Sequence, residues 1–356
     1  MRLSRPFAAT AAVALGLTLA ACSTGSDEDA DAASSDPSDS ASSDDASGES
    51  GDQFPLTIEH MYGETVIESK PETVVTVDWA NQEAALALGV VPAGMPKVTW
   101  GDDDDNGILP WVEDSLTELG AETPVLFDET SGYDFAAIEQ LNPDVILAAY
   151  SGMEQEDYDL LSQIAPVVAP PEVAWGTTWQ QLTLVNGTAL GLKTEAEALV
   201  ADLEAQLGEV TTEHPEIDGL TTIFSSPDPN DLSTIGFYTL NDPRALFLDE
   251  LGFTAAPVVD ESSEGSDEFW LTYSSEEVDR FSDVDVIVGY GGDSTLAELQ
   301  ADALWSRIPA VANGAVAVLP ANAPLAAAAN PSPLSIPSEY TTQFVDMLSE
   351  AARAAA

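Results

Sequence analysis

The densest set of potential metal ligands is an acidic run with calcium-loop spacing. Residues 102–113 read DDDDNGILPWVE, with Gly107 at the position of the sharp turn. The ligand positions of that pattern fall on Asp102, Asp104, Asn106 and Glu113. The preceding residues are typical of strand and loop rather than helix, and Pro110 occupies the ninth loop position. Two interpretations stay open: a calcium site, or an acidic surface loop.

Residues suited to catalysis are scarce. The only histidines are His60 and His214, so one chain cannot supply a three-histidine metal site. There is no G-x-S-x-G or H-E-x-x-H motif, and GTALGLKT (187–194) lacks the glycine directly before lysine that a phosphate loop needs. Carboxylates are so numerous that no pair is diagnostic of glycoside hydrolysis. We therefore expect neither an enzyme nor a protein with a metal or other cofactor.

The single cysteine, Cys22, lies at the end of an apolar run. Arg2 and Arg5 precede residues 7–20, a run with the length of a signal-peptide core and too short to span a bilayer. The segment Leu-Ala-Ala-Cys that follows resembles the lipobox of bacterial lipoproteins, which implies a signal peptide over 1–21 and acylation of Cys22. Two or three acyl chains would anchor the protein firmly. The alternative is ordinary secretory cleavage near Ala21.

Composition changes sharply after the cysteine. Residues 23–53 hold ten acidic side chains with no Lys, Arg or aromatic residue, which predicts a disordered, extended segment. We interpret 22–53 as a lipidated tether. A disordered tail that only aids solubility would have the same sequence features. Residues 54–356 carry seven basic and 53 acidic side chains, a net charge of −46 that would repel nucleic acid.

The folded part alternates short apolar runs with amphipathic segments. Buried parallel strands are expected within 73–79, 144–150, 221–226, 285–290 and 315–320. Helices are expected at 81–89 and at 242–253, where Asp242 would cap and Pro243 would occupy the first turn. Similar stretches at 138–147 and 278–288 suggest two related lobes. This order predicts an α/β protein with mostly parallel sheets.

A long helical signal lies between the two halves. An apolar stripe runs through about 195–209, and Thr194 with Glu197 has the spacing of a capping box. We expect this helix to join the lobes. The predicted organisation is an N-terminal lobe over 54–177, a helical segment over 178–210 that includes the interlobe helix, and a C-terminal lobe over 211–356.

Several segments together resemble one family, the iron-siderophore substrate-binding lipoproteins of ABC importers. The segments are FPLTIEHMYGETVIESKPETVVTVDWANQEAALALGVVPAG (54–94), AAIEQLNPDVILAAYSG (136–152), LLSQIAPVVA (160–169), FLDELGF (247–253), LWSRIPAVANGAVAVLP (304–320) and PSPLSIP (331–337). The resemblance implies two Rossmann-like lobes joined by a single long helix, with the ligand in the cleft between them.

The resemblance also implies partners and a location. The protein would be a monomer, held by its lipid on the outer face of the cytoplasmic membrane of a Gram-positive bacterium. It would deliver a ferric siderophore to an ABC permease, each lobe contributing a glutamate to the contact. Glu276 matches the C-lobe glutamate, although it could be an ordinary solvated residue. Ala136 departs from the family at the N-lobe position, where Glu139 or Asp134 could substitute.

Ligand residues are expected at the carboxyl ends of strands that face the cleft. The candidates are Trp79, Trp100, Tyr150, Trp175, Tyr238, Arg244, Trp270 and Tyr290. Rings offer broad contact to a bulky complex, and an arginine can donate to iron-ligating oxygens. Each ring could instead be a core residue.

The shortage of cations favours a neutral or cationic ferric hydroxamate over a trianionic tris-catecholate. Arg244 is the main candidate cation for the cleft, and Lys97 is the second. Other readings remain: a cobalamin or haem binder, a two-lobed surface hydrolase, or a structural surface protein without a small ligand.

Overall fold

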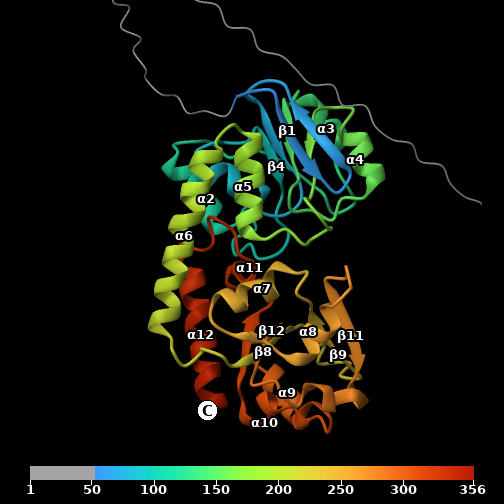
Figure 1. The fold of residues 1–356 in the computed structure, drawn as a ribbon, viewed down its shortest axis with the longest axis vertical. Coiled ribbons are helices and arrows are strands. Elements are labelled where there is room, and N and C mark those ends of the chain that lie inside the picture. The colour runs from blue at the N-terminus through green and yellow to red at the C-terminus, as the bar shows by residue number, and fades with distance from the viewer. Residues whose placement is uncertain (1–52) are drawn as a thin grey trace, which may run out of the picture. The chain divides into compact units, whose positions relative to one another are not determined.

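The computed structural model describes residues 53–356, which form two α/β lobes, each built around a large β-sheet (Figure 1). The predicted signal peptide, Cys22 and the tether lie outside the described residues. We call the layer around the first sheet, from β1 to α5, the N lobe, and the layer around the second sheet, from β8 onward, the C lobe.

The N-lobe sheet is parallel throughout, in the order β5-β4-β3-β6-β7. Its strands are β3 (Val74–Thr76), β4 (Gly94–Pro96), β5 (Val125–Phe127), β6 (Val145–Leu147) and β7 (Val167–Val168). An antiparallel hairpin, β1 (Leu56–His60) and β2 (Gly63–Ile67), precedes them. The central strands β3 and β6 are buried at every residue, as a sheet covered on both faces requires.

Helices cover the N-lobe sheet and supply its connections. They are α1 (Asn81–Ala87), α2 (Pro110–Glu118), α3 (Phe135–Gln140), α4 (Gln155–Leu161) and α5 (Trp179–Ala189). The sheet separates two apolar clusters, because successive residues of β3 and β6 point to opposite faces: Val74 and Val145 pack with α1 and α5, whereas Val75 and Ile146 pack with α3 and α4.

The C-lobe sheet is mixed, in the order β11-β9-β8-β12-β13, with β10 also on β8. Its strands are β8 (Thr221–Ser225), β9 (Thr234–Tyr238), β10 (Thr254–Ala255), β11 (Trp270–Ser274), β12 (Val286–Gly291) and β13 (Val316–Pro320). Strands β8, β10, β12 and β13 run parallel, and β9 and β11 are antiparallel to their neighbours. The two sheets therefore share parallel strand pairing, but only the C-lobe sheet also contains antiparallel strands.

The C-lobe helices are short apart from the last. They are α7 (Pro243–Glu250), α8 (Pro257–Ser263), the 3₁₀ segment η1 (Ser275–Phe281), α9 (Thr295–Ala301), η2 (Trp305–Arg307), α10 (Pro309–Asn313), α11 (Pro324–Ala328) and α12 (Glu339–Ala355). Helix α7 begins as predicted, because the Asp242 side chain accepts from the N–H of Arg244 and Pro243 lies in the first turn. Most of their buried side chains join one core that includes Phe237, Phe247 and Phe344.

A single long helix, α6 (Lys193–Glu213), runs from α5 to the C lobe (Figure 1). Near its start Ala196 packs so closely on Gly187 of α5 that a Cβ there would lie 2.5 Å from the Ala196 Cβ. Further along, Val200, Leu203 and Leu207 enter the C-lobe core. Each end of α6 is thus packed against a different lobe, which confirms the predicted bridging helix.

The predicted start of this helix was wrong. Leu192 is the N-cap and no side chain caps the helix, so Thr194 lies inside the first turn rather than before it. The carbonyl of Leu192 already accepts from the N–H of Ala196 at 2.9 Å. The helix can start there because Gly191, at φ +67°, turns the chain sharply out of α5.

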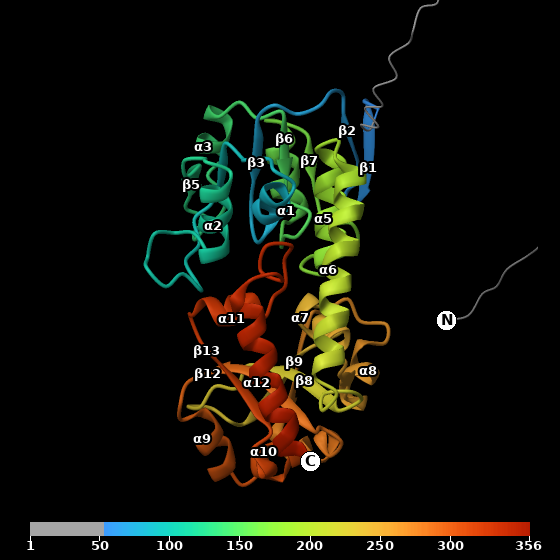
Figure 2. The ribbon, with the colours of Figure 1, turned by 90° about the vertical axis from the view of Figure 1, so that its left-hand side faces the viewer.

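The chain crosses to the N lobe a second time near its C-terminal end. Residues Ala327 and Ala328 of α11 lie in the apolar cluster of Leu86 and Trp111, which belong to α1 and α2. In Figure 2 the red segment after α11 rises toward α1 before α12 descends. Residues 324–340 therefore form a second physical link between the lobes, which the sequence did not indicate.

Candidate functional site

A cavity of about 280 Å³ opens between the lobes and is lined mainly by rings. Its lining residues are Trp79, Trp100, Tyr150, Trp175, Arg244, Phe269 and Asn330. Five of the eight ligand candidates from the sequence are among them. Phe269 and Asn330 were not predicted from the sequence.

The β3–α1 turn sets the position of Trp79. Asp78 and Ala80 both have positive φ, 58° and 61°, so the chain reverses sharply between strand and helix. The buried Asn81 amide holds this turn by donating to the carbonyls of Val77 and Tyr150, both at 2.9 Å. The same side chain accepts from the N–H of Tyr150 at 3.2 Å. One asparagine thus fixes the carboxyl ends of two neighbouring strands, from which Trp79 and Tyr150 reach the cavity.

Trp175 is held in an uncommon backbone conformation. Its φ is +60°, a region that bulky side chains rarely adopt. Its N–H donates to the carbonyl of Ser151 at 2.9 Å, and its ring crosses Gly152 so closely that a Cβ on Gly152 would lie 2.2 Å from the indole nitrogen. The ring also meets Tyr150 edge-on at 5.3 Å between centroids. The rest of the fold therefore maintains a strained tryptophan at the cavity wall.

The other predicted rings form a continuous series across the two lobes. Trp79 lies 6.1 Å from Trp100, and Trp100 meets Tyr290 edge-on at 5.4 Å. Phe224 then contacts both Tyr290 and Tyr238, at 5.2 and 5.5 Å.

Trp270 closes the series at 4.8 Å from Tyr238. The structure therefore places Tyr238, Tyr290 and Trp270 behind the cavity lining, in contact with rings or with Arg244.

Arg244 lines the cavity, and its positive charge is paired with the carboxylate of Asp242. Its Nε and Nη2 donate to the two carboxylate oxygens of Asp242, each at 2.7 Å. Its guanidinium carbon lies 3.9 Å from the centre of the Tyr238 ring. Burial raises the pKa of Tyr290 to about 12 and also raises that of Tyr238, so both phenols stay neutral at physiological pH. This wall presents hydrogen-bond donors without a net positive charge.

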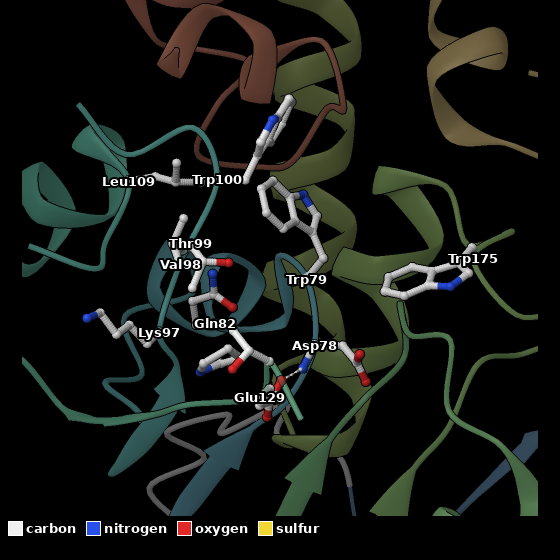
Figure 3. A pocket seen from close by; sticks show the side chains of 12 residues that line it. Asp78, Trp79, Gln82, Lys97, Val98, Thr99, Trp100, Leu109, Glu129 and Trp175 are labelled. Carbon is white, nitrogen blue, oxygen red and sulfur yellow. Dashed lines mark hydrogen bonds between the residues drawn. The ribbon is translucent and has the colours of Figure 1, made fainter. Parts of the chain in front are cut away.

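An adjoining cavity of about 210 Å³ shares Trp79, Trp100 and Trp175 and has polar groups at one end (Figure 3). Asp78 and Glu129 meet there, the N–H of Asp78 donating to Glu129 Oε2 at 3.0 Å. Neither residue was predicted from the sequence. Asp78 lies in the run 73–79, where a strand was expected, whereas Glu129 follows β5, which was not expected. The abundance of carboxylates in the sequence hid them.

The acidic loop 102–113 has the helix that follows a calcium loop but not the helix that precedes one. Asp102 accepts from the N–H groups of Asp104 and Gly107, at 3.1 and 2.6 Å, and α2 follows the loop. No helix precedes it, and the exposed loop satisfies its own backbone through these contacts. Carboxylate oxygens of Asp102, Asp103 and Asp104 lie within 4.8 Å of one another. The calcium hypothesis therefore stays open, as does the acidic-loop interpretation.

The predicted permease contacts lie on the surface. Glu276 is exposed in η1, whose N-cap is Ser274. Glu139 is exposed in α3, and so is Ala136. Asp134, the other substitute, caps α3 by accepting from the N–H of Ala137 at 3.0 Å. Glu139 thus has the freer carboxylate. Across residues 53–356, no helix has the length and apolar character needed to span a bilayer.

Two α/β lobes, one bridging helix and a ring-lined cavity between the lobes define a two-lobed solute-binding protein. Comparison with known families gives the same result at the level of sequence. The chain belongs to the periplasmic binding protein family, whose model matches residues 74–323.

The chain is similar to particular members with known structures or curated descriptions. It is 41% identical to PiaA of Streptococcus pneumoniae TIGR4, solved in complex with ferrichrome, over 84% of this chain and 99% of that chain, with a TM-score of 0.80. It is 28% identical to the probable siderophore-binding lipoprotein YfiY of Bacillus subtilis (strain 168), over 72% of this chain and 78% of that protein. A periplasmic solute binding protein of Mycobacterium smegmatis, 24% identical over 83% of this chain and 98% of that chain, shares the fold with a TM-score of 0.67.

Proposed function

We propose that this protein captures a ferric siderophore between its lobes and delivers it to an ABC importer permease. The observation that carries the proposal is the ring-lined cavity, to which both lobes contribute. Trp79, Trp100 and Trp175 offer flat apolar area at low entropic cost, which suits a bulky metal complex. The ferrichrome complex of PiaA and the description of YfiY support this ligand class.

The electrostatics of the cavity favour a hydroxamate complex. Among the described residues, Arg244 is the only cation that lines the ring cavity, and Asp242 neutralises it through two hydrogen bonds. A ferric tris-catecholate carries about three negative charges and would need several converging cations. A ferric hydroxamate is neutral at its centre. The donors of Arg244 and the amide of Asn330 suit its carbonyl and hydroxamate oxygens.

We place the protein on the outer face of the cytoplasmic membrane, attached through lipid on Cys22. The apolar run before Cys22 and the lipoprotein description of YfiY support this location. Glu276 and Glu139 are proposed to contact the permease, one from each lobe, with the protein acting as a monomer. The division into 54–177, 178–210 and 211–356 remains our proposed domain organisation.

Fluorescence titration of the purified domain tests the ligand. Three tryptophans line the cavity, so a bound iron complex should quench emission strongly. We expect a ferrioxamine to bind at least about tenfold more tightly than a ferric tris-catecholate, a difference of about 1.4 kcal/mol. The reverse order would refute the charge argument. Preferential binding of haem or cobalamin would replace the siderophore proposal, and recovery of a chemically altered siderophore would indicate an enzyme.

A further inference from the structure

The cavity beside the ring pocket contains acceptors that lack donors. Glu129 Oε1 is buried and no described residue donates to it. Gln82 Oε1 is in the same state, and this side chain is only 4% exposed although it lines the cavity. Asp78 completes the group, with one oxygen accepting from the Tyr133 hydroxyl at 2.5 Å. In Figure 3 these side chains lie on one side of Trp79, Asp78 and Gln82 coming from the β3–α1 turn and the start of α1, and Glu129 from the segment after β5.

Leaving these acceptors unmatched is costly. A buried acceptor without a donor loses its hydrogen bonds to water without replacement, and a buried carboxylate loses more unless a cation pairs with it. Burial raises the pKa of Asp78, and burial together with the charge of Asp78 raises the pKa of Glu129. Both directions have one origin: burial without a counter-ion disfavours the charged form of each carboxyl, and a cation placed beside them would favour it.

Lys97, the one cation among the described residues that line this cavity, does not neutralise the acids. Lys97 lines the cavity but is exposed, and Figure 3 shows its amino group extending away from Glu129. Within residues 53–356 no ion pair joins Lys97 to Asp78 or Glu129. A cationic donor brought by the ligand would satisfy what the protein leaves unmatched.

We propose that Asp78, Glu129 and Gln82 form a subsite for an ammonium group on the ligand, so that the cargo is a cationic ferric hydroxamate with a free amine. This inference rests on the function proposed above. An ammonium has three N–H donors, which could pair with acceptors of the three residues because all of them line this cavity. The iron centre would lie against the rings of the shared wall, because both cavities include Trp79, Trp100 and Trp175.

The test compares two ligands that differ only at the amine. Ferrioxamine B carries a terminal ammonium, and its N-acetyl derivative has the same iron centre without that charge. The wild-type protein should bind the ammonium form at least about tenfold more tightly, which is the effect of one charge-assisted hydrogen bond of about 1.5 kcal/mol or more. Glu129→Gln and Asp78→Asn should each reduce this preference toward onefold and leave affinity for the acetylated form within about twofold.

Asp128→Asn is the matched control, because it removes the same unit charge from an exposed neighbour that does not line the cavity. It should retain the preference, which separates local recognition from attraction by the acidic protein as a whole. Asparagine tolerates the positive φ of position 78, and affinity for the acetylated form reports whether each variant is folded.

Equal wild-type affinity for the two ferrioxamines would overturn the ammonium subsite and leave the siderophore proposal intact. A preference that survives both cavity substitutions would overturn it as well. Failure of both ferrioxamines to bind, with haem or cobalamin binding instead, would overturn the proposed function itself.

Discussion

Replacing Glu83 by glutamine should make the protein more stable at neutral pH, by an amount that grows with pH. Glu83 is 1% exposed, in α1. Its Oε2 accepts from the indole N–H of Trp111 at 2.6 Å and from the hydroxyl of Ser332, which lies beyond α11. Burial raises the pKa of this carboxyl to about 7. Glutamine keeps the shape and an acceptor oxygen but cannot ionise.

The sign and size of the effect follow from proton linkage. The carboxyl has a pKa of 4.5 when unperturbed and about 7 in the folded protein. Between those values the folded state holds more protons than the unfolded state, so the free energy of unfolding falls as pH rises. At about 1.4 kcal/mol for each pKa unit, the full loss is about 3 kcal/mol. Glu83→Gln removes this loss, so its advantage over wild type should grow by that amount from about pH 4.5 to about pH 7.5.

Urea unfolding followed by tryptophan fluorescence, at several pH values across this range, measures the difference. Other carboxyls titrate in both proteins and cancel when the two curves are subtracted. Glu113→Gln is the control, since it removes a carboxyl from the exposed face of the same helix as Trp111 rather than from the interior. A flat difference for Glu83→Gln, or one that shrinks as pH rises, would refute the assignment of Glu83 as a buried carboxyl with a raised pKa.

Three further predictions concern the anchor, the cavity and the permease. Cys22→Ala should release the protein into the medium with its fold unchanged, and retention on salt-washed membranes would contradict the lipid anchor. Gly152→Ala should lower siderophore affinity by about tenfold or more, because the new methyl group would displace the Trp175 ring; titration checks this, and unchanged affinity would show that the ring position is not needed. Glu276→Ala and Glu139→Ala should leave affinity unchanged and reduce cellular uptake, so normal uptake in the double variant would remove both residues from the interface.

The elements with strong local signals could be predicted from the sequence. The apolar runs at 221–226, 285–290 and 315–320 became β8, β12 and β13, and the run at 73–79 contains β3. Their length and apolar content identify them because parallel strands are buried on both faces. The start of α6 could not be predicted in the same way. A capping box is a local preference, and here the sharp turn at Gly191 allowed the helix to begin earlier.

The residues of the site also differ in whether a local sequence signal identifies them. Aromatic side chains at strand ends are rare enough to stand out, and Trp79, Trp100, Tyr150 and Trp175 all reached the cavity. The two acids did not stand out among the 53 acidic side chains of residues 54–356, and only burial distinguishes Asp78 and Glu129 from solvated carboxylates. Asn330 could not be found from sequence, because it reaches Tyr150 through the second link between the lobes.

That second link has a consequence for biogenesis. The apolar cluster around Leu86 and Trp111 is completed by Ala327 and Ala328, more than 200 positions later in the sequence. During synthesis the apolar cluster of Leu86 and Trp111 therefore stays partly exposed until residues 324–340 have been made. Contacts of such long sequence separation form slowly, and an uncovered apolar face invites aggregation. A chain interrupted after β13, which has every described strand but lacks α11 and α12, should then be a better substrate for chaperones and proteases than its complete sheets would suggest.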